Sequence, residues 1–554
     1  MKGAQRGMKL NRESIGAAQA WRAAGMRLPD YDVEAVTRRT LEAPAWVHFG
    51  AGNIFRGYVA HIAQRLLNAG LADTGVIAAE TFDGEILRRI YAPHDSLALL
   101  VRMLPDGRLE KEVVASIAAG LDAQEAAGRA QLERIFASPS LQMVSFTITE
   151  KGYALTGLDG RPTPQALADM EAGPAGARGA MGVAAALLHA RYRAGAYPVA
   201  MVSMDNCSRN GDRLRDAVRA MAQAWCERGL ADAGFAAYLR DGRVTFPLTM
   251  IDKITPRPDE AVRRALEADG LEDMAPVTTA RGTYIAPFVN AEAAEYLVVE
   301  DDFPAGRPPL ERAGVYMADR ETVNRSERMK VMTCLNPLHT ALAVFGCLLG
   351  YTRINEEMRD ADLRALVERI GAVEGLPVVE DPGIIRPEAF LREVIDERLP
   401  NPYLPDAPQR IATDTSLKIP IRFGGTIRRY VERPDLDVGA LVGIPLAIAA
   451  WLRYLLGVDD GLRAMQVSPD PQLPQLRAAL TGVEPGRPQS YAGQLRPLLA
   501  QEALMGVDLC ACGLAGRVED AFVRMLAGPG AVRRTLREAL DRQSEREGKG
   551  HDAL

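Results

Sequence analysis

Short apolar runs alternate with helix-like segments up to about residue 310 of the chain. Residues 46–49 form an apolar run, a glycine-containing turn follows, and residues 62–67 have helical spacing before the next apolar run, 76–79. This order predicts a strand, turn, helix, strand unit. Further apolar runs lie at 97–101, 141–148 and 198–204. Ala-rich helical segments such as 179–194 separate them. The alternation predicts a doubly wound, mostly parallel sheet, as in Rossmann-like α/β domains.

Few strand-like apolar runs occur after about residue 310, where long helix-like segments predominate. Examples are 361–370, 441–456 and 518–526. A Pro/Gly-rich stretch at 303–309 lies where the strand-like pattern gives way to the helix-like one, and it is our candidate domain boundary. A surface loop inside one domain is the alternative. The expected organisation is a lead-in at 1–42, expected to be mobile at its start, a Rossmann-like domain at 43–307 and a mostly α-helical domain at 308–554. The charged segment 533–554 predicts a solvated helix followed by disorder.

Composition describes an ordinary soluble protein, with 47% hydrophobic residues, 25% charged residues and a net charge of −6. No basic stripe or long acidic block appears, which argues against nucleic acid or a charged membrane surface as the partner. A small-molecule substrate is the better expectation, and the sequence does not set the oligomeric state. The apolar windows 340–351 and 441–458 are interpreted as buried helices rather than membrane spans.

Six scattered cysteines do not form a disulfide framework, and this fits a reducing compartment. We therefore expect a cytoplasmic location. The first 20 residues are polar and basic without an apolar core, so they do not resemble a secretory signal.

The turn after residue 49 carries candidate cofactor chemistry. Gly50 and Gly52 would let the backbone turn tightly and approach a pyrophosphate at the start of a helix. Phe55 stands where the G-x-G-x-x-G pattern has its third glycine, so a plain tight turn is the alternative. Arg56 could supplement the phosphate charge. Asn53 and Ile54 complete the predicted cofactor turn.

A carboxylate at the end of the second strand would accept hydrogen bonds from an adenosine ribose and repel a 2′-phosphate. Glu80 stands at that position, with Asp83 as a nearby alternative. The sequence therefore favours NAD over NADP.

Hydride transfer to a ketone also needs a proton donor and groups that stabilise negative charge on the carbonyl oxygen. None of the 15 tyrosines starts a Tyr-x-x-x-Lys motif, so the chain lacks the catalytic motif of the short-chain dehydrogenases. The scattered cysteines and only six histidines argue against a catalytic zinc, so no metal is expected. Cys510 and Cys512 are interpreted as packed thiols.

The segment 327–339 places Lys330, Asn336 and His339 within about three helical turns, just before an apolar stretch. The segment 410–418 adds two more cations in largely apolar surroundings. Because buried cations are costly, we interpret the first segment as a catalytic helix that enters a core.

Taken together, these residues resemble the polyol-specific long-chain dehydrogenases, a family that includes mannitol 2-dehydrogenase, fructuronate reductase and tagaturonate reductase. The resemblance covers most of the chain. It rests on the segments 50–56, 147–153 and 250–256, on Asp205-Asn206 with Asn210-Gly211, on Lys330 with Asn336 and His339, and on Arg410 with Lys418.

The resemblance implies that Lys330 is the general acid/base and that Asn206 and Asn336 form an oxyanion-type cradle. It also implies that His339, Arg410 and Lys418 hold the substrate. Glu150 matches a family carboxylate that helps to relay protons; a capped strand end is its structural alternative.

Two further positions bear on this assignment. Lys151 matches a position that tends to be lysine in the hexuronate reductases and glycine in the mannitol enzymes; a solvated surface lysine is the alternative. Lys330 precedes Asn336 by six residues where the family has five, and we expect a local helix bulge to absorb the extra residue.

The sequence thus predicts a metal-independent, NAD-dependent reductase of a 2-keto sugar acid, with D-fructuronate and D-mannonate as the expected pair. A mannitol 2-dehydrogenase, or an enzyme for another polyol and ketose pair, is the alternative. A catalytically silent NAD-binding protein is the alternative from a different class.

Overall fold

The computed structural model describes residues 7–157 and 159–551, with side chains up to residue 541. The chain divides into two compact units, Met1–Asn324 and Arg325–Leu554. Among the described residues of the second unit there are isolated bridges but no strands, so the expected helical character of the second half is confirmed.

The first unit is built on a six-stranded sheet with the order β6-β3-β2-β7-β8-β9, in which all neighbouring strands are parallel. This is the doubly wound order 3-2-1-4-5-6 of dinucleotide-binding domains. The strands are β2 (Trp46–Phe49), β3 (Val76–Glu80), β6 (Ile117–Asp122), β7 (Met143–Phe146), β8 (Val199–Ser203) and β9 (Val244–Thr245). The predicted strand, turn, helix, strand unit is therefore confirmed.

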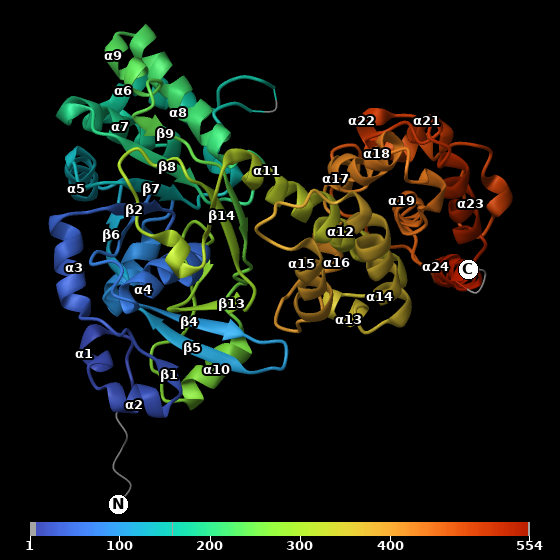
Figure 1. The fold of residues 1–554 in the computed structure, drawn as a ribbon, viewed down its shortest axis with the longest axis horizontal. Coiled ribbons are helices and arrows are strands. Elements are labelled where there is room, and N and C mark those ends of the chain that lie inside the picture. The colour runs from blue at the N-terminus through green and yellow to red at the C-terminus, as the bar shows by residue number, and fades with distance from the viewer. Residues whose placement is uncertain (1–6, 158, 552–554) are drawn as a thin grey trace, which may run out of the picture. The chain divides into compact units, whose positions relative to one another are not determined.

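Side chains along these strands alternate between two cores, one on each face of the sheet. Val47 and Phe49 pack with helices α5 (Ala126–Ala137), α7 (Ala180–Gly195) and α8 (Asn210–Glu227). Trp46 packs on the other face with the π-helix η1 (Phe55–Val59) and α4 (Ala60–Asn68). Helices α6 (Pro164–Gly176), α7, α8 and α9 (Ala233–Tyr238) group beside β8 and β9 (Figure 1).

One predicted strand lies outside the parallel sheet. Residues 98–101 of the predicted run 97–101 fall in β4 (Ala98–Met103), which pairs antiparallel with β5 (Leu109–Val114) in a second sheet of order β1-β5-β4-β13. A short turn, closed by the Leu104 N–H to Arg108 O hydrogen bond of 3.0 Å, joins the two strands into a hairpin. The remaining strands are β1 (Met26–Arg27), β10 (Thr249–Asp252), β11 (Val277–Thr278), β12 (Tyr284–Ile285), β13 (Phe288–Glu292), β14 (Tyr296–Glu300) and β15 (Tyr316–Ala318).

The expectation of a mobile lead-in is wrong for the residues that the structure describes from residue 7 onward. Leu10 and Trp21 are fully buried, and the Trp21 indole N–H donates to Ser14 O at 3.0 Å. These side chains gain too much apolar burial to leave the segment in solvent. The segment forms α1 (Arg12–Ile15), α2 (Ala18–Ala23), β1 and α3 (Val33–Glu42).

The two compact units divide later in the chain than the expected boundary at 307/308. Residues 308–318 stay with the first unit because β15 adds to the edge of β14 as a parallel strand. The first unit also holds α10 (Glu260–Ala268), and α11 (Arg320–Arg328) runs across the division.

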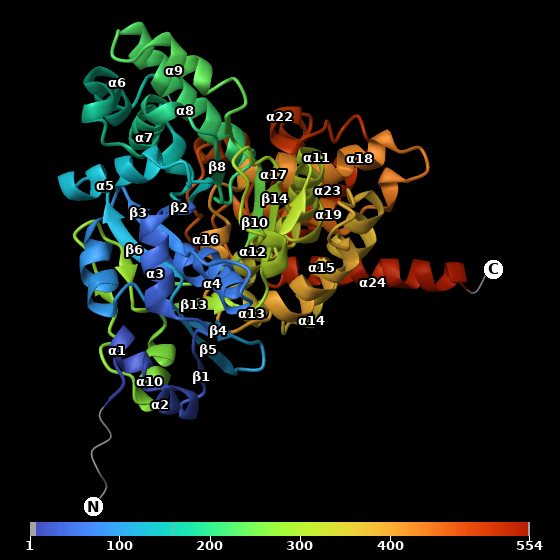
Figure 2. The same cartoon turned by 60° about the vertical axis from the view of Figure 1, so that its left-hand side comes forward.

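Two buried helices form the centre of the second unit, α12 (Asn336–Leu349) and α19 (Gly443–Tyr454). The charged C-terminal segment forms the long helix α24 (Ala531–His551), which extends away from the other helices of this unit in Figure 2. The other helices are α13 (Ile354–Glu357), α14 (Ala361–Glu368), α15 (Pro387–Glu393), α16 (Pro408–Ile411), α17 (Thr415–Arg422), α18 (Gly424–Glu432), α20 (Leu473–Ala479), α21 (Arg496–Leu499), α22 (Glu502–Met505) and α23 (Ala515–Met525).

One helical stretch, Arg320–Leu349, is long and apolar enough to cross a membrane by length and composition. Because 78% of its most apolar window is buried inside the protein, it has the character of a core helix.

Candidate active site

The glycine turn lies where the strand order of the parallel sheet reverses, between β2 and its neighbour β7. Gly50 has φ +105°, and a Cβ there would lie 2.2 Å from Thr147 O at the end of β7. A Cβ on Gly52 would meet only open space, and the Gly52 carbonyl accepts the Arg56 N–H at 3.1 Å to start the helix. A glycine is thus required at 50, and the backbone at 52 stays accessible. This cradle fits a dinucleotide pyrophosphate.

Glu80 ties the glycine turn to the loop after β3. Its Oε2 accepts the Ala51 N–H at 3.0 Å, and its Oε1 accepts the Thr81 and Phe82 N–H groups at 2.9 and 2.8 Å. A carboxylate has about four acceptor sites, so Oε2 keeps capacity for a ribose hydroxyl. Asp83 is buried and accepts the hydroxyls of Thr279 and Thr283, both at 2.6 Å, which gives it a structural role.

Arg56 lies in the interior instead of facing the turn. It is 1% exposed, and its guanidinium donates to Ala286 O and to Asn53 Oδ1, both at 2.8 Å. Burial lowers the pKa of Arg56 to about 10. The arginine thus holds Asn53 in the first helical turn, where Ile54 is also half-buried. Contact of any of these three residues with a cofactor stays a prediction.

A second loop of the first unit carries Glu150 and Lys151, and Asp205 holds it in place. The Asp205 carboxylate accepts the Ile148 and Thr149 N–H groups, both at 2.9 Å, and the Tyr153 hydroxyl at 2.6 Å. Thr149 has φ +65°, a conformation that a non-glycine residue adopts only when its surroundings enforce it. Asp205 therefore fixes this loop directly beside Asn206, its neighbour in the chain.

Hydrogen bonds hold the start of α8 against Asp205, which follows the end of β8, and against Thr249. Asn210 Nδ2 donates to Asp205 O at 2.9 Å and to Thr249 Oγ1 at 2.8 Å, while its Oδ1 accepts the Thr249 N–H. A Cβ on Gly211 would lie 2.5 Å from Pro247 O, so the next residue must be glycine. The Asn210-Gly211 pair thus has a structural explanation in the close packing of α8 on β10.

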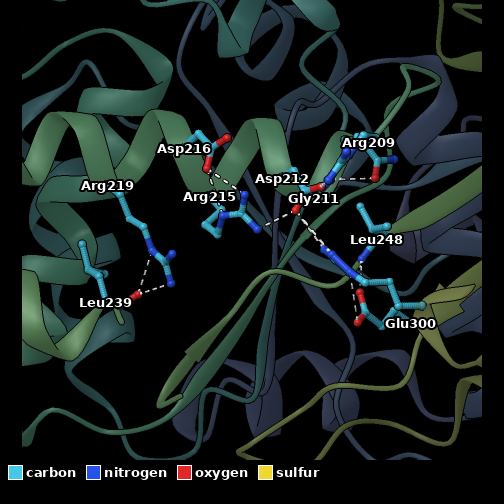
Figure 3. Close-up of polar contacts among 11 residues, drawn as sticks. Arg209, Gly211, Asp212, Arg215, Asp216, Arg219, Leu239, Leu248 and Glu300 are labelled. Carbon is cyan, nitrogen blue, oxygen red and sulfur yellow. Dashed lines mark hydrogen bonds and ion pairs between the residues drawn. The ribbon is translucent and has the colours of Figure 1, made fainter. Parts of the chain in front are cut away.

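Arginines surround Asp212 in the first turn of α8 (Figure 3). The carboxylate accepts from Arg209 at 2.8 Å, from Arg215 at 2.6 Å and from Arg320 at 2.9 Å. Burial opposes its charge, but the three arginines hold the pKa of Asp212 below its usual value. The next residue, Arg213, pairs with Glu150 at 3.0 Å on the exposed surface, a contact that adds little stability.

In the second unit, Lys330 lies on the π-helix η6 (Met329–Cys334), which joins α11 to α12. The Leu335 N–H donates to Lys330 O at 3.1 Å, five residues back, so the π-helix takes up the extra residue before the non-helical Leu335 and the start of α12 at Asn336. The predicted helix bulge is confirmed. Lys330 itself is 2% exposed.

Asn336 starts α12, and His339 follows one turn later. Burial lowers the pKa of His339 to about 4, so the imidazole is neutral near pH 7. Its Nε2 lies 3.9 Å from Asp406 Oδ2. Arg422, which the sequence analysis did not single out, donates to Thr340 Oγ1 at 2.8 Å and to Asn336 O at 3.4 Å.

Arg410 and Lys418 come from the adjoining helices α16 and α17. Arg410 pairs with Asp406, the same carboxylate that lies near His339. Lys418 Nζ donates to Ile411 O at 2.8 Å and to Thr413 O. Burial, followed by repulsion from Arg422, lowers the pKa of Lys418 to about 8. The structure therefore brings Arg410 and Arg422 close to both Lys418 and His339.

Sequence reasoning missed three residues that this geometry makes prominent: Asp205, Asp406 and Arg422. In the sequence, Asp205 stands out only as part of a motif. Asp406 precedes Arg410 by four residues, a spacing that permits an ion pair on a helix, and this signal was available. Arg422 follows Lys418 by four residues on α17, which placed it on the same face.

Comparison with known proteins identifies the family. Residues 44–312 match the model of the mannitol dehydrogenase Rossmann domain, and residues 322–509 match that of the mannitol dehydrogenase C-terminal domain. The chain belongs to the mannitol dehydrogenase family. Among the residues that the structure describes, no group of three or more His, Cys, Asp or Glu side chains could hold a metal ion.

Relatives in this family include enzymes for sugar acids and for neutral polyols. A D-mannonate oxidoreductase of Thermotoga maritima is 50% identical over 539 residues, which cover 97% of this chain and 100% of the relative. A mannitol 2-dehydrogenase of Cereibacter sphaeroides is 30% identical, over 78% of this chain and 84% of the relative.

Two solved structures of polyol dehydrogenases share the fold across both units of this family member. A substrate-free D-sorbitol dehydrogenase has a TM-score of 0.74 and 26% identity, over 91% of this chain and 98% of its own. The Pseudomonas fluorescens mannitol 2-dehydrogenase, a ternary complex with NAD and D-mannitol, has a TM-score of 0.69 and 26% identity, over 96% and 100%.

Proposed function

We propose that this protein is an NAD-dependent oxidoreductase that interconverts D-fructuronate and D-mannonate. The observation that carries the proposal is the 50% identity, over nearly the full length of both chains, to a D-mannonate oxidoreductase. The Rossmann domain, with Gly50 required by its surroundings and Glu80 beside it, supports NAD as the cofactor.

The proposed chemistry assigns a role to each predicted catalytic residue. Bound NADH supplies a hydride to the ketone carbon. Protonated Lys330 gives its proton to the carbonyl oxygen as the hydride arrives, and the reverse reaction returns that proton to the lysine. Asn206 and Asn336 donate hydrogen bonds that stabilise the negative charge on this oxygen. Glu150 relays protons to water, which agrees with its exposure.

Three cations of the second unit, Arg410, Lys418 and Arg422, support a sugar acid rather than a neutral sugar as the substrate. Arg410 and Lys418 would pair with the substrate carboxylate, and neutral His339 would bind its hydroxyl groups. Lys151 is exposed on its loop in the first unit and is the further candidate for a carboxylate contact. The surface alternative for Lys151 therefore stays open.

The test is NADH oxidation by the purified protein at neutral pH, without added metal, on D-fructuronate, D-tagaturonate and D-fructose. We expect D-fructuronate to be reduced with the highest kcat/KM. A preference for D-fructose would instead support a mannitol 2-dehydrogenase, the alternative that the mannitol 2-dehydrogenase relatives favour. The silent-protein alternative rested partly on the spacing of Lys330, which the π-helix accommodates; NADH binding without turnover on any of the three compounds would revive it.

Titration of Lys418 gives a pH signature for substrate binding. Its ammonium is charged below its lowered pKa of about 8 and loses the charge above it, while the substrate carboxylate stays ionised throughout. KM for D-fructuronate should therefore rise about tenfold between pH 7 and 9. Lys418→Arg, whose charge persists, should keep KM nearly constant over this range. The same rise in both proteins would remove Lys418 from carboxylate binding.

Glu80 should set the preference between the two cofactors. Glu80→Ala should weaken NADH binding about tenfold or more, because the variant loses the ribose acceptor and leaves the Ala51, Thr81 and Phe82 N–H groups without their partner. Discrimination against NADPH should also relax, since the repulsion of its 2′-phosphate is gone. Dissociation constants for NADH and NADPH measure both effects, and unchanged values would remove Glu80 from cofactor recognition.

We also propose a cytoplasmic location and a small-molecule substrate as the partner, without nucleic acid or membrane. All six cysteines lie in the described part of the chain and none of them forms a disulfide, which supports a reducing compartment.

A further inference from the structure

A cavity of about 540 Å³ opens in the first unit. It lies among α2, β1, α4, β4 and β5, elements that take no part in the chemistry proposed above. Its volume is within the usual range for small-molecule sites. Its walls are formed by Arg22, Met26, Arg27, Leu28, Asp30, His61, Arg65, Asn68, Ala69, Arg102 and Glu112, which include four arginines against two carboxylates.

Three of these arginines are held in place by ion pairs, two of them with carboxylates that lie outside the lining. Arg27 pairs with Glu112 at 3.1 Å, Arg65 with Glu295 at 2.5 Å and Arg102 with Glu110 at 2.8 Å. Each of these contacts uses one of the five N–H donors of a guanidinium, so donors remain for a ligand. The fourth, Arg22, has no side-chain partner within the described ranges, so all five N–H donors of its guanidinium are available to a ligand. The lining is therefore preorganised for an anion.

A buried histidine in the cavity wall lacks a hydrogen-bond donor for one of its ring nitrogens in the part of the chain that the structure describes. His61 is 3% exposed, and its Nε2 lies 3.3 Å from Glu112 Oε1. Burial lowers the pKa of His61, so the ring is neutral with its proton on the nitrogen that faces the carboxylate. The other nitrogen, Nδ1, is then an acceptor, and it has no partner among the described residues. This nitrogen is covered by protein atoms, so a ligand hydroxyl would reach it once the neighbouring side chains shift.

The cavity is separate from the dinucleotide turn. His61 and Arg65 lie on α4, whose helical path begins at the Gly52 carbonyl. Thirteen residues of helix separate Gly52 from Arg65, and at about 1.5 Å per residue this places them roughly 20 Å apart. One cofactor molecule bound with its pyrophosphate at the turn would not account for the arginines at the far end of the helix.

We infer that this cavity is a binding site for a small hydroxylated anion, such as a sugar acid or a sugar phosphate. The arginines would pair with the carboxylate or phosphate, and His61 would accept a hydroxyl. This inference stands independently of the substrate proposed above.

Isothermal titration of the full chain with D-gluconate and with D-glucose 6-phosphate tests the inference, with D-sorbitol as the neutral probe. We expect binding of one of the anions, which tells a carboxylate from a phosphate ligand, and no binding of D-sorbitol. Arg22→Ala and Arg27→Ala should each weaken that binding about tenfold or more. Arg38→Ala, which removes an exposed arginine of α3 outside the cavity, is the matched control and should leave it unchanged.

Two results would overturn the inference. One is the absence of binding of both anions at millimolar concentration. The other is binding that all three arginine variants reduce equally, or that neither cavity variant reduces, because the anion would then sit elsewhere on the protein. Unchanged NADH binding by each variant serves as the check that the first unit is folded.

Discussion

Lys330→Ala should lower the turnover of D-fructuronate by a factor of about 10² to 10⁴, because general acid–base catalysis contributes in this range. NADH binding should be preserved, since the predicted cofactor residues all lie in the other compact unit. The lysine is buried on a π-helix, a feature that often marks functional sites. Steady-state kinetics gives the turnover, and the quenching of protein fluorescence by NADH gives the binding.

The role of Lys330 in proton transfer can be separated from the role of its charge. Lys330→Arg retains the charge but holds its proton too tightly to transfer it, so this variant should be nearly as inactive as the alanine variant. Added methylammonium should restore part of the turnover of Lys330→Ala and none of that of Lys330→Arg. Full activity of either variant would exclude Lys330 as the general acid.

The fold was predictable where local pattern decides structure. The alternation of short apolar runs with helical segments identified β2, β3, β7, β8 and the doubly wound sheet, because each strand is buried on both faces. The pattern did not reveal that residues 98–103 belong to a second sheet, since strand pairing depends on partners elsewhere in the chain. For the same reason it missed that Trp21 packs into the first unit.

The candidate site was predictable in its residue types and less so in their environments. The irregular spacing of Lys330 and Asn336 correctly predicted a helix bulge, because one extra residue in a helix can be taken up only locally. That Arg56 is buried against Ala286 O could not be foreseen, since its partner lies 230 residues away. The three hydrogen bonds that Asp205 accepts were hidden in the same way, because their donors come from a separate loop.

Gly50→Ala should destabilise the protein by about 3 kcal/mol or more and abolish NADH binding, because two costs act together at this position. The backbone has φ +105°, which an alanine adopts only under strain, and the new methyl group would lie 2.2 Å from Thr147 O. The clash is with backbone, so no side chain can rotate away, and β2 must separate from β7. Denaturant unfolding without cofactor measures the loss of stability.

Gly52→Ala is the matched control, because the two glycines belong to the same turn but differ in their surroundings. A Cβ at Gly52 meets nothing within 4 Å, so the stability of the cofactor-free protein should stay within about 1 kcal/mol of the parent. NADH binding should nevertheless weaken, since the methyl group would occupy the space left for the pyrophosphate. This contrast separates a glycine needed for the fold from one needed for the cofactor. Equal stability losses in the two variants, or normal NADH binding by both, would show that the turn does not hold the dinucleotide as proposed.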